Sequence, residues 1–447
     1  MTQQPTKQPW TIAAAAIAAG MAFIDTTALT VALPALRESL HASDSELLWI
    51  HNAYAVTLAA LLLLSGSLGD RYGIRRVFLF GIASFGLSSI ACGFAPSAPA
   101  LIALRGLQGV SAALMIPGSL AMIARATPGH ALGRAVGIWS TFTLIATALG
   151  PVLGGLLVQN GLWRGVFFIN APLAAAAFLI TLKRTSADPP SPPLRPALDW
   201  PGALLLIIGL ASLSFALIHR SLLFASGTVS FLLFYFREKS TSNPLLPMAL
   251  LRSRPLLAAS LISLLIYSAW AGFTYLLPTY LIETLHFAPA TAGLLQIPTL
   301  LLLAIVSPIA GKLLDRHGPR LTLALGTFLC ALGFALLLWP GFIDYPYTII
   351  APLLLLGLGL GFCAAPLSAT IINSIPAQHH GLAAGINSTA ARIASALGVA
   401  LLGSLAYQDH NLDFSVLGAS ATILCLLAVP VTLAFTPRKK STPTTES

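Results

Sequence analysis

The segment "GSLGDRYGIRR" at residues 66–76 brings together three arginines and one aspartate in a chain whose charged residues make up only 9% of the total. A second segment, "GKLLDRHGPR" at residues 311–320, repeats the pattern G-x-L-x-D-R-x-G-x-R at an offset of 245 residues. A loop selected for positive charge alone would not repeat the glycine and aspartate positions. Because internal repeats in membrane proteins are typical of secondary transporters, the two segments predict a chain built from two related halves.

The composition indicates a membrane protein. Of the 447 residues 56% are hydrophobic, so a water-soluble fold would lack the polar residues to cover its surface. The net charge of +10 comes from short basic clusters between apolar runs, which indicates topology signals and no nucleic-acid partner. The four cysteines lie in apolar stretches without metal-ligand spacing, so we expect no disulfide framework, no metal site and no cofactor.

Fourteen apolar stretches approach the roughly 20 residues that a helix needs to cross a bilayer, and the eighth is the shortest. The first stretch is too long for a signal peptide, so we expect it to be retained. The fourteen stretches cover residues 10–33, 48–68, 76–95, 99–123, 134–158, 163–182, 201–219, 221–236, 256–281, 289–311, 320–339, 346–368, 382–406 and 414–436.

The basic residues predict the orientation of these spans. If both termini are cytoplasmic, nineteen of the 24 lysines and arginines fall in cytoplasmic segments. Arg105 and Arg392 fall within spans, and only Arg37, Arg164 and Arg220 fall on the opposite side of the membrane. This bias predicts a multi-pass protein of the plasma or inner membrane with both termini in the cytoplasm. Twelve spans would fit the charges equally well. If the seventh and eighth stretches did not cross the membrane, the number of spans would stay even and both termini would remain on the same side.

A proline-rich segment, "KRTSADPPSPPLRPALD" at residues 183–199, divides the chain. So many prolines exclude a continuous helix and indicate a linker. We therefore predict an all-α protein with an N-terminal six-helix bundle (1–183), a linker with two additional transmembrane helices (184–253) and a C-terminal six-helix bundle (254–447).

The repeated loops suggest a role in controlling conformation. Gly73 and Gly318 allow a tight turn, and the aspartates can accept hydrogen bonds at a helix start or pair with a nearby arginine. The arginines hold each loop at the cytoplasmic surface. The residues assigned to this gating role are Gly66, Asp70, Arg71, Gly73, Arg75, Arg76, Asp315 and Arg316.

Several stretches resemble motifs of the major facilitator superfamily. The opening segment is similar to its loop signature between spans two and three, and "LRGLQGVSAALMIPG" (104–118) resembles its fourth-span R-x-x-Q-G motif. "ALGPVLGG" (148–155), "IDTTALTVALP" (24–34), "WRGVFFINAPLA" (163–174) and "ASALGVALLG" (394–403) resemble the branch of fourteen-span drug:proton antiporters. The resemblance implies two bundles around a central cavity, with transport by alternating access.

Asp25 is the one acidic residue that we place deep in a span. A carboxylate in low dielectric is costly, so intramembrane acids are functional candidates by default. We expect Asp25 to take part in proton coupling or to contact substrate. The alternative is a structural carboxylate that is hydrogen-bonded to Thr26, Thr27 or a neighbouring helix.

Arg105 in the fourth span needs a partner within the membrane. The resemblance places spans one and four at the cavity, so it implies that Arg105 pairs with Asp25 and that the pair couples proton binding to conformation. A fixed salt bridge, or hydrogen bonds from Arg105 to carbonyl groups, is the alternative. Gln108 lies one helical turn later, where it can orient Arg105 or donate to substrate. Arg392, in the thirteenth span, is expected to extend to the membrane interface.

Two further groups of residues complete the predicted site. Gly150, Pro151, Gly154 and Gly155 can bend the fifth span and pack it closely, either as ordinary helix packing or to seal the cavity. Aromatic residues can line a cavity for a drug-like ligand, although each alone can equally face lipid. The aromatic candidates for substrate binding are Tyr54, Trp139, Phe142, Trp270 and Tyr275.

These observations favour a proton-coupled efflux transporter for drug-like or amphipathic small molecules, acting as a monomer. A narrower metabolite substrate, self-resistance to an antibiotic, or proton-coupled uptake are the alternatives within the same class. A membrane receptor or channel is the alternative of another class, and the repeated loop argues against it. We expect no enzymatic activity, because no ATP-binding G-x-x-x-x-G-K-[ST] motif and no long extramembrane domain is present.

Overall fold

The computed structural model describes residues 8–127, 131–188, 198–221, 223–241, 244–246, 253–339, 341, 346–374, 380–408 and 411–436. These residues are almost entirely helical, and the two-residue strands β1 (Tyr407–Gln408) and β2 (Asn411–Leu412) form a small antiparallel hairpin. The helices are α1 (Gln8–Leu40), α2 (Asp44–Tyr72), α3 (Ile74–Gly93), α4 (Ala98–Ala126), α5 (Ala131–Gln159), α6 (Gly165–Phe168), α7 (Asn170–Arg184), α8 (Trp200–His219), α9 (Phe224–Ser240), α10 (Arg254–Thr279), the π-helical turn η2 (Tyr280–Thr284), α11 (Pro289–Leu294), α12 (Ile297–His317), α13 (Pro319–Leu336), the 3-10 turn η4 (Pro346–Ile349), α14 (Ile350–Asn373), α15 (His380–Ala406) and α16 (Phe414–Phe435).

Thirteen helical segments within the described residues are long and apolar enough to cross a membrane. Four of them join neighbouring helical pieces, such as α10 with η2. A helix also lies at the eighth predicted stretch, but α9 has 17 residues, fewer than the roughly 20 of a full crossing. The prediction of an all-helical, multi-pass membrane protein is therefore confirmed.

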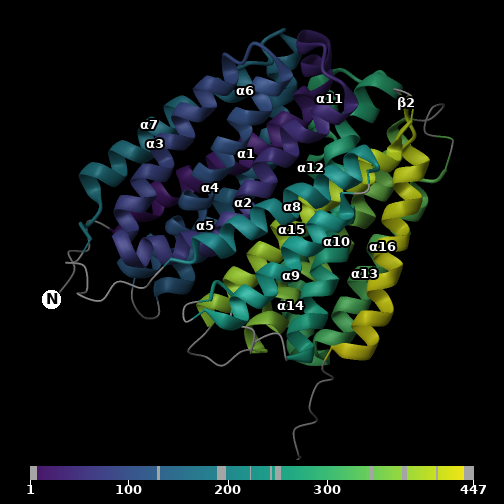
Figure 1. Ribbon diagram of the computed structural model, residues 1–447. Helices are drawn as coiled ribbons and strands as arrows, with labels where there is room; N and C mark the ends of the chain where they lie inside the picture. The colour runs from purple at the N-terminus through teal and green to yellow at the C-terminus, as the bar shows by residue number, and fades with distance from the viewer. Residues whose placement is uncertain are drawn as a thin grey trace, which may run out of the picture.

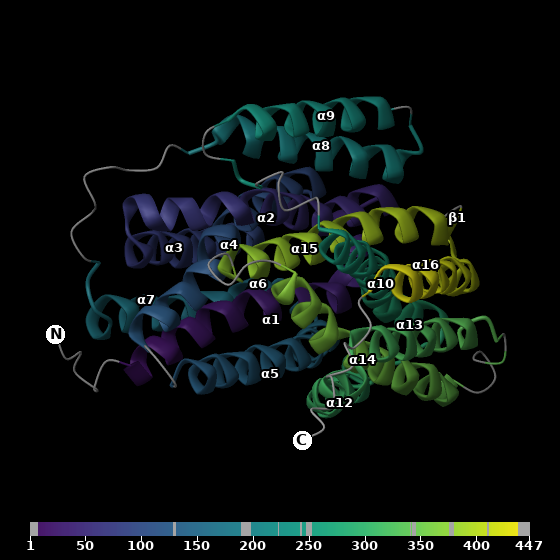
Figure 2. The same cartoon turned by 90° about the horizontal axis from the view of Figure 1, so that it is seen from below.

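The helices form two groups that follow the order of the chain. Figure 1 shows α1 to α7 in purple and blue on one side and α10 to α16 in green and yellow on the other. Helices α8 and α9 pack against each other, and α8 also contacts α2 and α15, one helix from each group (Figure 2). The start of α1 and the end of α16 lie at the same end of the molecule, here called the terminal end; the β1–β2 hairpin marks the opposite, hairpin end.

The two repeated loops form the same tight junction in both groups. Gly73, between α2 and α3, has φ 97°, and Gly318, between α12 and α13, has φ 80°. Glycine adopts this left-handed region without steric cost. Each glycine N–H donates to the last turn of the preceding helix, Gly73 to the Gly69 carbonyl at 2.9 Å and Gly318 to the Leu314 carbonyl at 2.8 Å. The predicted turns are confirmed.

We expected the aspartate of the first loop either to cap the next helix or to pair with a nearby arginine, and within the described residues it does neither. Asp70 lies in the last turn of α2, where free carbonyls, not N–H groups, are available, and its side chain is exposed without an ion pair to any described residue. The cap of α3 comes from Asp188, after α7. Its carboxylate accepts from the backbone N–H groups of Arg75 (3.0 Å) and Arg76 (3.1 Å). The side chain of Asp315, the second loop's aspartate, lies outside the described residues.

Asp188, which follows α7, also contacts both α3 and α4 at the terminal end. The Arg125 guanidinium, in the last turn of α4, lies 2.6 Å from the Asp188 carboxylate. Arg75 in turn donates from Nη2 to the Leu182 carbonyl (2.7 Å) and from Nε to the Thr185 hydroxyl (3.1 Å), which satisfies acceptors at the end of α7. The loop arginine therefore holds α3 to α7.

These contacts make the Asp188 carboxylate a stronger acid. Burial acts to raise the pKa of Asp188, but the hydrogen bonds from the Arg75 N–H, the Arg125 side chain and the Arg76 N–H outweigh burial and lower the pKa below 3.8. Because the folded-state pKa is lowered, this stabilisation is present above pH 3.8 and is lost as the pH falls through the lowered value.

We expect Asp188→Ala to lower the free energy of unfolding by about 1 kcal/mol or more, as loss of a helix cap typically does. Asp188→Asn keeps an oxygen for the cap but loses the charge, so its loss should be smaller. Thermal unfolding followed with a thiol-reactive dye measures this directly, because Cys92, Cys330, Cys363 and Cys425 are all buried. Unfolding of both variants at the parent's temperature would contradict the assigned cap.

Candidate functional site

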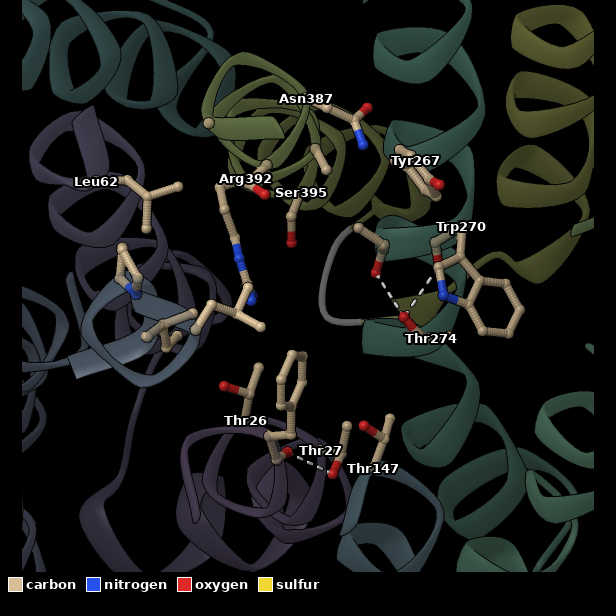
Figure 3. A pocket seen from close by; sticks show the side chains of 18 of the residues that line it. Thr26, Thr27, Leu62, Thr147, Tyr267, Trp270, Thr274, Asn387, Arg392 and Ser395 are labelled. Atoms are coloured by element: carbon tan, nitrogen blue, oxygen red, sulfur yellow. Dashed lines mark hydrogen bonds between the residues drawn. The ribbon is translucent and has the colours of Figure 1, made fainter. Parts of the chain in front are cut away.

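A cavity of about 1020 Å³ lies between the two groups of helices. Its wall comes from α1, α2, α4 and α5 on one side and from α10, α12, α14 and α15 on the other (Figure 3). The lining reaches Gly66, Ser67 and the exposed Asp70 at the end of α2, so the cavity extends to the terminal end. This volume suits a drug-sized molecule.

The lining combines apolar and aromatic side chains with scattered hydroxyl groups. Of the predicted aromatic candidates, Trp139, Trp270 and Tyr275 line the cavity. Figure 3 shows Tyr267, Trp270 and Thr274 of α10 on one side of the space, and Thr26 and Thr27 of α1 on the other, with Thr147 of α5 beside Thr27. Such a wall accepts flat apolar ligands while offering hydrogen bonds to their polar groups.

Three predicted substrate contacts do not reach the cavity. Phe142 of α5 is 57% exposed and lies outside the lining, so its predicted position is corrected. Tyr54 is buried and lies beneath Arg105, whose guanidinium carbon is 4.4 Å from the ring centroid. Gln108 is buried behind the cavity wall. Sequence alone could not separate these faces, because apolar side chains suit lipid, the helix core and the cavity equally.

Asp25 of α1 and Arg105 of α4 form a fully buried ion pair. The Arg105 Nη1 and the Asp25 Oδ2 are 2.5 Å apart, and both side chains have 0% exposure. Gln108 Nε2 donates to Asp25 Oδ1 at 2.9 Å, while its own oxygen accepts from Arg105 at 2.7 Å. Arg105 Nε also donates to the Ile50 carbonyl at 3.3 Å. The buried charges are thus paired and largely hydrogen-bonded, as low dielectric requires.

Asn170 completes this network, and the sequence analysis missed it. The side-chain amide, at the start of α7, donates to Asp25 Oδ1 at 2.8 Å and lies 2.9 Å from the Ser89 hydroxyl. An isolated amide inside the apolar stretch 163–174 was the available signal, because a polar side chain within a span needs a partner. Asp25 therefore accepts from α4 and α7 together.

The ion pair lies behind the cavity wall. Asp25 and Arg105 do not line the cavity, whereas Phe23 and Thr26, on either side of Asp25 in α1, do. His51 of α2, also missed from the sequence, is buried in the wall with its ring 5.2 Å from that of Tyr275. In this conformation a ligand would contact the residues in front of the pair and not the pair itself.

Arg392 lies in the cavity and not at the membrane interface, which corrects the prediction from sequence. It is twelve residues into α15, about 18 Å from the start of the helix, and this is too far for its side chain to reach the terminal end. Figure 3 shows the side chain pointing into the cavity. Its guanidinium carbon is 5.3 Å from the ring centroid of Phe23.

At the hairpin end the two groups of helices are joined. Arg37 of α1 pairs with Asp44 of α2 at 2.7 Å and with Glu283 of η2 at 3.2 Å, so one guanidinium bridges both groups. The missing side chains of Gly154 and Gly155 let the α5 backbone approach Ala28 of α1 and Pro289 of α11.

The remaining residues of the fifth-span motif lie in the same packing. Gly150 faces Thr27 of α1, and the Pro151 carbonyl faces Gly293 of α11. Pro151 also lines the cavity. The four motif residues therefore pack α5 between the two groups near the hairpin end.

We expect Arg105→Met to destabilise the protein by roughly 3–5 kcal/mol, because it leaves the Asp25 carboxylate buried and unpaired. Adding Asp25→Asn to this variant removes the unpaired charge and should restore most of the stability. Thermal unfolding of the parent, both single variants and the double variant in one detergent forms the test. A double variant no more stable than Arg105→Met would show that the pair contributes through something other than charge compensation.

Comparisons with known proteins agree with this architecture. The chain is 34% identical over 418 residues to the tetracenomycin C resistance and export protein of Streptomyces glaucescens, covering 89% of this chain and 76% of that protein. It is 32% identical over 430 residues to the multidrug efflux pump LfrA of Mycolicibacterium smegmatis, covering 92% and 84%.

Solved structures share the fold. A D-xylose-proton symporter matches with a TM-score of 0.69 and 14% identity over 97% of this chain and 99% of that chain. The peptide transporter POT, in complex with sulfate, matches with a TM-score of 0.70 and 18% identity over 95% and 94%. The model of the Major Facilitator Superfamily matches residues 15–399 and 259–446. The chain belongs to the Major Facilitator Superfamily.

Proposed function

We propose that this protein exports drug-like, amphipathic small molecules in exchange for protons. The observation that carries the proposal is the pairing of a large aromatic cavity with a buried carboxylate directly behind its wall. The cavity supplies a binding site for a small molecule, and Asp25 supplies a group that can take up and release a proton within the membrane. The relatives named for export and multidrug efflux support the direction of transport.

We also propose an architecture of fourteen spans. In it, residues 1–183 and 254–447 form two six-helix bundles, and α8 and α9, within residues 184–253, add two spans. The distribution of basic residues supports a cytoplasmic terminal end in the plasma or inner membrane. We expect the protein to act as a monomer. The structure then corresponds to a cytoplasm-facing state, because the cavity reaches the terminal end and the hairpin end is joined.

In the proposed mechanism, the proton acts on the ion pair. Protonation of Asp25 removes the negative charge that holds Arg105, Gln108 and Asn170 to α1. An unpaired buried arginine is unfavourable, so the contacts among α1, α4 and α7 must change. The proton thereby favours one orientation of the two bundles and substrate the other.

A pH-gradient experiment tests this mechanism. In inverted vesicles with an imposed pH gradient, adding a transported dye should release protons from the parent protein. Asp25→Asn should abolish this release while leaving dye binding measurable, because Asp25 does not line the cavity. Asp413→Asn, at the hairpin end, removes an acidic residue outside the cavity and serves as the control. Normal coupling in Asp25→Asn would refute the role given to Asp25.

A narrower antibiotic substrate is the second candidate, favoured by the tetracenomycin C relative. A susceptibility panel in an efflux-deficient host distinguishes the two. Resistance to several unrelated compounds indicates multidrug export, and resistance to a single compound class indicates the narrower function.

We also expect the repeated loop to control the terminal end. Asp70 is an exposed acidic residue where the cavity opens, so it is placed to pair with a cation of the other bundle when that end closes. Asp70→Asn should reduce transport several-fold with unchanged membrane insertion, which protease protection and quantitative blotting can measure. Lost insertion would instead indicate that Asp70 acts only in topology.

A further inference from the structure

Arg392 carries a charge that the described part of the protein does not neutralise. Among the described residues that line the cavity, two are charged, Arg392 and Asp70. Within the described residues, Arg392 has no ion pair, and its guanidinium carbon lies over the face of Phe23, 5.3 Å from the ring centroid. A cation–π contact compensates only part of the cost of a guanidinium in an apolar protein interior.

Asp70 is too far away to serve as the counter-ion. Helices α2 and α15 run antiparallel, because Gly385 faces Leu63 and Gly403 faces Leu48. Arg392 is therefore level with residue 57 of α2, thirteen residues before Asp70. At 1.5 Å per residue this is about 20 Å along the helix, and such a separation exceeds the Debye length at physiological ionic strength.

The surroundings of Arg392 suit an anion attached to a flat ring. A guanidinium presents a planar fork of N–H donors that matches a carboxylate or another oxyanion. Figure 3 shows Thr26 and Ser395 beside the Arg392 side chain, and Trp270 and Tyr267 across the cavity. An acidic group at Arg392 would thus place an attached aromatic ring towards the aromatic wall of α10.

We propose that the cavity selects aromatic, amphipathic compounds that carry an acidic group, such as a carboxylate or an ionised phenol, and that Arg392 binds this group. The inference rests on the proposed function and narrows its substrate class. The anion and the proton then occupy separate sites, because Arg392 belongs to α15 and Asp25 lies behind the wall formed by α1. Removing the Asp25 charge should therefore not weaken anion binding.

Two dyes of opposite charge provide the test. Fluorescein is an anion and rhodamine 6G a cation at pH 7.5, and they share the same ring system. Binding is measured by fluorescence anisotropy on the full-length protein in lipid nanodiscs. We expect Arg392→Gln to weaken fluorescein binding by about tenfold or more, as expected for loss of a charge-assisted contact. Rhodamine 6G binding should stay unchanged or become tighter.

Control variants separate charge from folding. Arg134→Gln removes an exposed arginine of α5 that does not line the cavity, and it should leave both affinities unchanged. Arg392→Lys keeps the positive charge but lacks the planar N–H donors of the guanidinium, so it should retain part of the fluorescein affinity. Such partial retention would show that the loss in Arg392→Gln comes from the missing charge and not from misfolding. Asp25→Asn should bind fluorescein at least as tightly as the parent.

Three results would overturn the inference. They are a parent that binds rhodamine 6G but not fluorescein, a parent that binds neither dye, and an unchanged fluorescein affinity in Arg392→Gln. None of them tests the proposed function, which depends on substrate-induced proton release and its loss in Asp25→Asn. An antiporter for cationic dyes would show that release with rhodamine 6G and not with fluorescein.

Discussion

The fully buried ion pair between Asp25 and Arg105 constrains the rest of the structure. Two charges without water must be paired, and their remaining polar atoms need partners. Gln108 and Asn170 supply two of these partners, so α1, α4 and α7 must meet at one level. The pair therefore sets how these helices pack, and any change of charge at Asp25 must act on all three.

The two ends of the molecule differ in how the two groups of helices meet. They are in contact near the hairpin end and are separated by the cavity towards the terminal end. Gly154 and Gly155 allow α5 to reach helices of both groups near the hairpin end, where Arg37 adds an ion pair across the groups. Towards the terminal end, the two groups of helices enclose a cavity whose lining includes Arg392. Joined contacts at one end and an open cavity at the other are what alternating access requires of a single conformational state.

Local chemistry made several features predictable from sequence. The turn glycines Gly73 and Gly318 were predictable because only glycine adopts their backbone conformation freely. The pairing of Asp25 with Arg105 was expected because each charge needs a partner in the membrane and because the resemblance to the superfamily placed spans one and four at the cavity. The helix cap from Asp188 was not predictable, because it comes from a segment more than one hundred residues after α3 begins. Phe142 was misplaced because the face that α5 turns to the cavity was unknown, and Arg392 because its depth along the helix was underestimated.

The sequence by itself determined that this is a helical membrane protein and predicted two related halves, because hydropathy and a repeated loop are properties of the chain alone. It also indicated that Asp25 and Arg105 need partners within the membrane. Only the tertiary structure decided which side chains face the cavity. Apolar residues suit lipid, the helix core and a ligand site equally, so packing alone placed Arg392 in the cavity and Asp25 behind its wall.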